Sequence, residues 1–63
     1  MQNQSTAEQF GIDSRVVIVP HEVEGIVDGI FTDRRGTQYL VEYKDKSGAI
    51  QSRYYGADQL HAA

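Results

Sequence analysis

Residues 25–55, GIVDGIFTDRRGTQYLVEYKDKSGAIQSRYY, decide the fold. They contain three short runs rich in β-branched and aromatic residues, separated by the polar segments 33–36 (DRRG) and 45–48 (DKSG). Glycine tolerates the positive φ that a tight turn requires, so a polar segment ending in glycine between two β-rich runs is typical of a hairpin. The sequence therefore predicts a meander of three strands, at 25–32, 37–44 and 50–55.

The alternation within these runs predicts which side chains face the core. In 37–44, Tyr39, Val41 and Tyr43 share one face, while Leu40 lies on the other face among polar residues. We expect Tyr39 and Tyr43 to be ordinary cross-strand packing residues.

The first run of the meander does not alternate cleanly. Val27 and Ile30 are three positions apart, and Gly29 lies between them. A β-bulge or sharp bend at Asp28-Gly29 is therefore expected to bring both apolar residues to the core side.

The flanking segments complete a small all-β domain. Residues 16–19 (VVIV) predict a first strand with Val16 and Ile18 on one face, and Phe10 and Ile12 are expected to pack over one end of the core. Residues 56–59 suit a single 3₁₀ turn, after which Leu60 returns to the core.

The predicted fold is thus a five-stranded small barrel over residues 10–63. Residues 61–63 form its last strand or a frayed end, and residues 1–9 (MQNQSTAEQ) form a flexible tail.

Length and composition limit the functions open to the chain. A domain of 63 residues buries a small core, so barrel closure or association with copies or a partner is the expected route to stability. The chain has no cysteine, which excludes disulfides and a thiolate metal site, and its two histidines, His21 and His61, are too few for a zinc site without carboxylates. No metal and no cofactor are expected. It has no signal peptide and no apolar run of membrane-spanning length, so we expect a soluble, cytoplasmic protein.

The charge is unevenly distributed. The net charge of −3 argues against nonspecific binding to nucleic acid, which depends on clustered cations. Residues 34–53 nevertheless contain five basic and two acidic side chains, giving +3 against −6 elsewhere. These five basic residues are Arg34, Arg35, Lys44, Lys46 and Arg53. A nucleic-acid-binding barrel that uses them therefore stays as an alternative function.

The most prominent candidate surface lies around two adjacent tyrosines. Tyr54 and Tyr55 point to opposite faces of a strand, so at least one is expected to be exposed or at an interface. Arg53 beside them and Leu40 on the outward face give an aromatic and basic surface suited to protein contact. Val17 and Val19 are expected to extend it, and such a patch favours homo-oligomerisation.

The layout resembles SH3-like small barrels of the Tudor and KOW type. The resemblance covers roughly residues 10–61 and is carried by 10–18 (FGIDSRVVI), 25–30 (GIVDGI), 39–43 (YLVEY) and 56–60 (GADQL). It implies the barrel fold and leaves the function open, because such barrels have many unrelated roles. It is also typical of short proteins from bacterial, phage and plasmid genomes.

One enzyme family with this fold and size is similar to the chain. Phe10-Gly11, Asp13, Arg15-Val16, Tyr55 and Leu60 resemble the first and last strands of the plasmid-borne type II dihydrofolate reductases. That family uses a VQIY stretch to line the pore of a tetramer, whereas residues 52–55 here are SRYY and match only at the tyrosine. Reductase activity in an oligomer is therefore the second alternative.

These observations favour a small non-enzymatic binding module that acts through protein contact or self-association. The histidines and serines form no recognisable catalytic arrangement, so no catalytic residue is assigned. The predicted binding residues are Arg53, Tyr54, Tyr55, Leu40, Arg34 and Arg35. The expected partner is another protein or a second copy of the chain, with nucleic acid second and no membrane.

Overall fold

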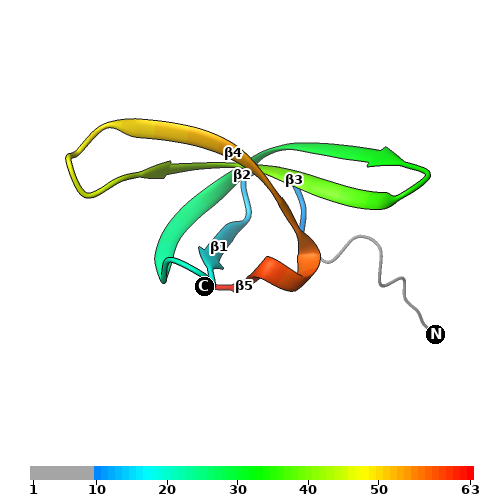
Figure 1. The fold of residues 1–63 in the computed structure, drawn as a ribbon, viewed down its shortest axis with the longest axis horizontal. Helices are drawn as coiled ribbons and strands as arrows, with labels where there is room; N and C mark the ends of the chain where they lie inside the picture. The colour runs from blue at the N-terminus through cyan, green and yellow to red at the C-terminus, as the bar shows by residue number, and fades with distance from the viewer. Residues whose placement is uncertain (1–9) are drawn as a thin grey trace.

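The computed structural model describes residues 10–63. Their strands form a single sheet of five antiparallel strands (Figure 1). The strands are β1 (Arg15–Ile18), β2 (Val23–Asp33), β3 (Gly36–Lys44), β4 (Ile50–Gly56) and β5 (Leu60–Ala62), with a 3₁₀ helix η2 (Ala57–Gln59) before β5. The all-β class, the five strands and the 3₁₀ turn before the last strand are confirmed. The predicted flexible tail at 1–9 lies outside the described residues.

The sheet curls but does not close. Its strand order is β4-β3-β2-β1-β5, so β4 and β5 are its two edges and no ladder joins them. Full closure, as expected for a barrel, is therefore absent from the described sheet. The three-residue β5 pairs with β1 on one side and offers only a short free side to β4.

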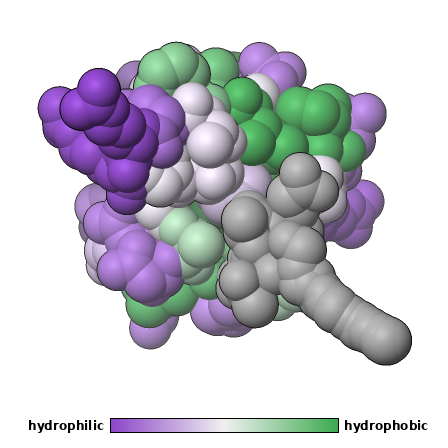
Figure 2. Space-filling view, turned by 90° about the vertical axis from the view of Figure 1, so that its right-hand side faces the viewer, coloured by the Kyte–Doolittle hydropathy of each residue, from purple (hydrophilic) through white to green (hydrophobic). Residues whose placement is uncertain are grey.

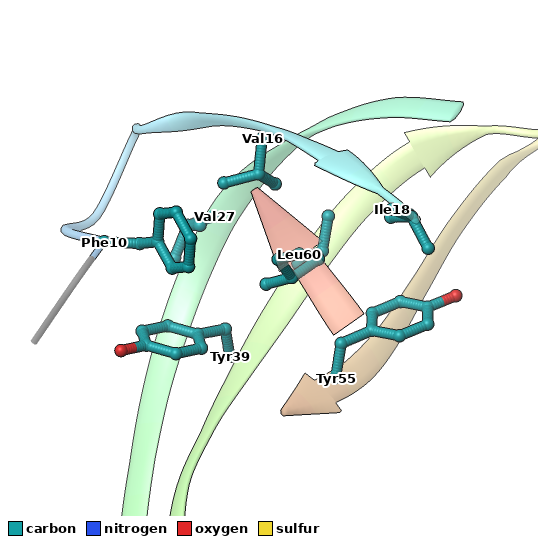
Figure 3. Close-up of a cluster of buried hydrophobic side chains, with 8 residues drawn as sticks. Phe10, Val16, Ile18, Val27, Tyr39, Tyr55 and Leu60 are labelled. Atoms are coloured by element: carbon teal, nitrogen blue, oxygen red, sulfur yellow. The ribbon is translucent and has the colours of Figure 1, made fainter. Parts of the chain in front are cut away.

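The core lies inside the curl of the sheet (Figure 3). Val16 and Ile18 of β1 are fully buried, as their alternation predicts, and so are Tyr39 and Val41 of β3. Leu60 of β5 projects into the middle of this cluster. The buried hydrophobic side chains of residues 10–63 are Phe10, Val16, Ile18, Val27, Tyr39, Val41, Tyr55 and Leu60.

Phe10 alone covers one end of the core. Its ring meets Tyr39 edge-on, with the ring centroids 5.3 Å apart at 84°. Ile12 was expected beside it, but that side chain is 54% exposed. Ile12 lies in a turn that is closed by a hydrogen bond from the Ser14 N–H to the Gly11 carbonyl, and this turn directs it away from the core.

The predicted β-bulge is present in β2. The β2–β3 register shifts between Val27 and Gly29, leaving Asp28 as the extra residue. Val27 is fully buried as expected, whereas Ile30 is 42% exposed. Ile30 pairs with Tyr39 but lies in the β2–β3 arm, which extends past the core (Figure 1). Ile30 therefore lies on the core side of the sheet, as expected, but it is not part of the buried core.

Gly25 of β2 packs closely against residues of β3. A Cβ atom at this position would lie 2.6 Å from Cγ1 of Val41 and 2.8 Å from the Glu42 carbonyl oxygen. Both distances are shorter than any relaxed contact, and one of the two atoms is backbone. Glycine is therefore required here for lack of space.

We expect Gly25→Ala to destabilise the fold by about 1–3 kcal/mol, the usual cost of overpacking. Gly29→Ala in the same strand is the matched control, because its Cβ would meet Leu40 at an ordinary 3.5 Å. Urea unfolding of both variants at 25 °C measures the difference. Equal midpoints for the two alanine variants would contradict the steric explanation.

Asp45 organises the turn between β3 and β4. Its Oδ1 accepts hydrogen bonds from the Ser47 N–H (2.9 Å), the Ser47 hydroxyl (2.7 Å) and the Ala49 N–H (3.0 Å). Its Oδ2 accepts one from the Gln51 amide at 2.8 Å. The bond from the Ser47 hydroxyl, followed by that from Gln51, lowers the pKa of Asp45 from 3.8 to about 2.

A lowered pKa makes the contribution of Asp45 to stability dependent on pH. The ionised carboxylate stabilises the fold above pH 4, and this contribution is lost as the pH falls from 3.8 towards 2. The melting temperature of the wild type should therefore exceed that of Asp45→Asn by a margin that is constant above pH 4 and shrinks towards pH 2.

The control for this prediction is Asp33→Asn in the β2–β3 turn, where Asp33 accepts one hydrogen bond, from the Arg35 N–H at 2.8 Å. Thermal unfolding followed by circular dichroism from pH 2 to 6 compares the three proteins. A margin for Asp45→Asn that does not change with pH would count against the assignment.

Candidate interaction surface

An exposed aromatic patch lies on the outward face of β2, β3 and β4. We define it by Phe31, Leu40 and Tyr54. Leu40 pairs with Gly29 on one side and with Tyr54 on the other. Phe31 follows two residues after Gly29 and therefore lies on the same face.

The two rings of this aromatic patch meet across β3. The ring centroids of Phe31 and Tyr54 are 6.4 Å apart at an interplanar angle of 63°, an edge-to-face arrangement. Phe31 is 51% exposed and Tyr54 is 55% exposed, while Leu40 between them is half-buried. Figure 2, seen from the end of the molecule that carries the β2–β3 turn, shows such hydrophobic side chains at the surface among strongly hydrophilic ones.

Tyr55 was predicted to lie in the binding surface, and the structure places it in the core instead. Its side chain is only 6% exposed, and its ring lies 6.5 Å from that of Tyr43. In the β4 ladder it pairs with Tyr39, which is fully buried, so both side chains point to the same interior face. Tyr54 is therefore the exposed member of the adjacent tyrosines.

The hydroxyl of Tyr55 is buried and finds no hydrogen-bond partner among residues 10–63. Burial, with the neighbouring Tyr43 phenol as a second cause, raises the pKa of Tyr55. An unsatisfied buried hydroxyl reduces stability, so the ring of Tyr55 contributes packing while its oxygen does not.

Arg53 lies on the opposite face of β4 from Tyr54. It pairs with Val41 and is exposed because β4 is an edge strand. The predicted grouping of Arg53 with Tyr54 and Leu40 is therefore wrong, since successive residues of a strand face opposite ways.

The other four predicted basic residues divide between two distant hairpin ends. Arg34 and Arg35 are exposed in the β2–β3 turn, whereas Lys44 is exposed at the end of β3 and Lys46 is exposed in the β3–β4 turn. These two turns lie at opposite ends of the long axis of the molecule (Figure 1). The structure therefore does not gather the basic side chains into one surface.

Val17 and Val19 do not extend the aromatic patch. Val17 pairs with Glu24 on one side and His61 on the other, so β2 separates it from Leu40 in β3. Phe31 is the apolar residue that extends the patch instead of Val17 and Val19. The sequence prediction did not include Phe31, because it did not continue the alternation of faces past the bulge.

Two further exposed apolar residues were also missed. Ile26 is 46% exposed and Ile50 is 57% exposed. Both line an open groove of about 490 Å³ together with side chains of both charges, among them Arg15 and Glu42. Their outward positions follow from pairing with Glu42 and Lys44, which are exposed residues of β3.

Clusters of metal-ligating side chains and long apolar helices were sought among the described residues. Residues 10–63 contain no group of three or more His, Cys, Asp or Glu side chains placed to hold a metal ion. The same part of the chain has no helix with the length and apolar character to cross a membrane.

Comparison with protein-family models, with curated proteins and with solved structures finds no match to this chain. The resemblances to SH3-like barrels and to type II dihydrofolate reductases therefore stay predictions.

The two adjacent tyrosines should respond very differently to truncation. Tyr55→Ala removes a buried aromatic ring and is expected to cost about 3–5 kcal/mol, which approaches the whole stability of a domain this small. Tyr54→Ala should cost less than about 1 kcal/mol, as for other exposed positions. Tyr55→Phe, which removes only the unsatisfied hydroxyl, should be at least as stable as the wild type.

Urea unfolding of these three variants tests the assignment of faces. A fold that tolerates Tyr55→Ala but loses several kcal/mol with Tyr54→Ala would reverse it.

Proposed function

We propose that this chain is a small non-enzymatic binding module that acts through protein contact at the aromatic patch, with a second copy of itself among its partners. The observation that carries the proposal is the exposed Phe31–Tyr54 ring pair, with more than half of each side chain open to solvent. Contiguous exposed apolar surface on a small domain marks an interaction site more often than chance.

The chemistry of the patch suits a protein ligand. Tyrosine and phenylalanine are enriched at the centres of protein interfaces, where large rigid rings bury much area with little loss of conformational freedom. Leu40 supplies an apolar floor between the rings, because Gly29 beside it has no side chain. The phenol of Tyr54 adds one hydrogen-bonding group.

The sheet holds the patch in place. Phe31, Leu40 and Tyr54 belong to three neighbouring strands whose ladders run over most of their length. On the other face of the same strands, Val27, Val41 and Tyr55 are buried in the core. A partner would therefore meet a preorganised surface, which lowers the entropic cost of binding.

Phe31→Ser tests this function directly, with Ile12→Ser as its control. The two apolar side chains are exposed to similar extents, 51% and 54%, but Ile12 lies in the turn before β1, outside the patch. Peptides selected from a displayed random library on the immobilised full chain serve as the probe.

We expect Phe31→Ser to weaken binding of the selected peptides at least tenfold, while Ile12→Ser leaves it unchanged. Peptides that bind both variants as tightly as the wild type would place binding elsewhere. A failure to select any peptide, combined with a monomeric mass by light scattering at every concentration, would overturn the proposed function.

A further inference from the structure

Within residues 10–63, strand β4 is an edge of the sheet with no strand on its outer side. Its seven residues pair with β3 without a bulge, from Lys44↔Ile50 to Gln38↔Gly56. It contains no proline, and its only charged residue is Arg53. Natural edge strands usually carry prolines, bulges or several charges, because a row of free backbone N–H and C=O groups invites another strand. The other edge, β5, has only three residues.

We propose that β4 pairs with β4 of a second copy, antiparallel and centred on Ser52, to form one continuous sheet. This inference rests on the self-association included in the proposed function and assigns it a surface. A two-fold axis that places identical strands side by side in antiparallel order must be normal to the sheet. Side chains on the outward face of β4 therefore lie opposite outward side chains of the second copy, and inward side chains lie opposite inward ones.

The exposed apolar residues of β4 select the register. With Ser52 at the axis, Ile50 of each copy lies opposite Tyr54 of the other on the outward face. These two side chains are 57% and 55% exposed. Aromatic and β-branched side chains form a favourable cross-strand pair, so this register buries both at once.

The neighbouring registers are less favourable. An axis at Arg53 would place the two guanidinium groups directly opposite each other, and like charges in that position are destabilising. An axis at Tyr54 would leave Ile50 without a partner beyond the end of the paired segment. An axis at Gln51 would place Tyr54 opposite Gly48, which has a φ of 91° and belongs to the turn.

The charges complement one another in the Ser52 register. On the inward face, Arg53 lies opposite Gln51 of the second copy, whose amide donates to the Asp45 carboxylate at 2.8 Å. Arg53 of one copy is thereby brought next to an anionic group of the other. The exposed turn with Lys46 also comes alongside the η2 segment of the second copy, which carries Asp58.

Cysteine cross-linking tests the register on a clean background, because the chain has no cysteine of its own. In the proposed dimer the two Ser52 residues are direct cross-strand neighbours, with Cα atoms about 4.5–5.5 Å apart, within the range for a disulfide. Ser52→Cys should therefore form a covalent dimer under mild oxidation.

Glu42→Cys is the matched control. Glu42 is exposed on the same face and pairs with Ser52 inside one copy, but the two Glu42 residues of the dimer are three strand spacings apart, about 14 Å. Arg53→Cys is the control for the register. Two cysteines at position 53 would lie directly opposite each other only if the two-fold axis passed through residue 53 and not through Ser52. We expect at least tenfold more covalent dimer from Ser52→Cys than from either control.

Light scattering of the wild type across a concentration series accompanies the cross-linking. A monomeric mass throughout, with no excess of covalent dimer from Ser52→Cys, would overturn the inference. Peptide binding that depends on Phe31 would survive that result and leave the proposed function intact. Dimers that cross-link through Phe31→Cys but not through Ser52→Cys would place self-association on the aromatic patch and would also overturn the inference.

Discussion

One additional residue in β2 determines which side chains form the core and which form the surface. Because Asp28 has no partner in β3, the alternation changes phase between Val27 and Gly29. Val27 faces the interior before this point, and Phe31 faces outward after it. Without the extra residue, the side chains beyond it would exchange faces, and Phe31 could not meet Tyr54 across Leu40. The core and the aromatic patch therefore depend on the same local feature.

The small core and the open sheet are related. Eight buried apolar side chains stabilise the described domain, and the curl of the sheet is enough to enclose them. Closure would require β4 to pair with the free side of β5, and a strand of three residues offers few backbone groups for that ladder. The stability that a closed barrel gains by pairing its edges is left available at β4 for an intermolecular contact.

Local patterns in the sequence were sufficient for most of the fold. The alternation of Val16 with Ile18 and of Tyr39 with Val41 identified the inward faces, and the two glycine-terminated turns fixed the hairpins. It was harder to predict which residues of β4 point into the core. Alternation places Tyr54 and Tyr55 on opposite faces, but their neighbours Ser52 and Arg53 are both polar and do not indicate which face is inward. Only the pairing of Tyr55 with Tyr39 decides it.

The candidate site depended on information that local patterns lack. Grouping Arg53 with Tyr54 assumed that neighbours in sequence share a surface, which is untrue within a strand. Phe31 could have been predicted from the sequence, since continuing the alternation from Gly29 places Phe31 on the outward face, near Leu40. The free edge at β4 could not be predicted in this way, because it follows from which strands pair across the described sheet, and no local pattern shows that β3 is the one neighbour of β4.

The position of Leu60 has a consequence for the order of events during synthesis. This side chain fills the middle of the core, and its strand supplies the second partner of β1. Strands β1 to β4 are all made before it, so a growing chain cannot complete the cluster around Val16 and Ile18 until residue 60 is available. The hairpins can form as they are translated, but the completed core is a late event that joins the two ends of the described chain.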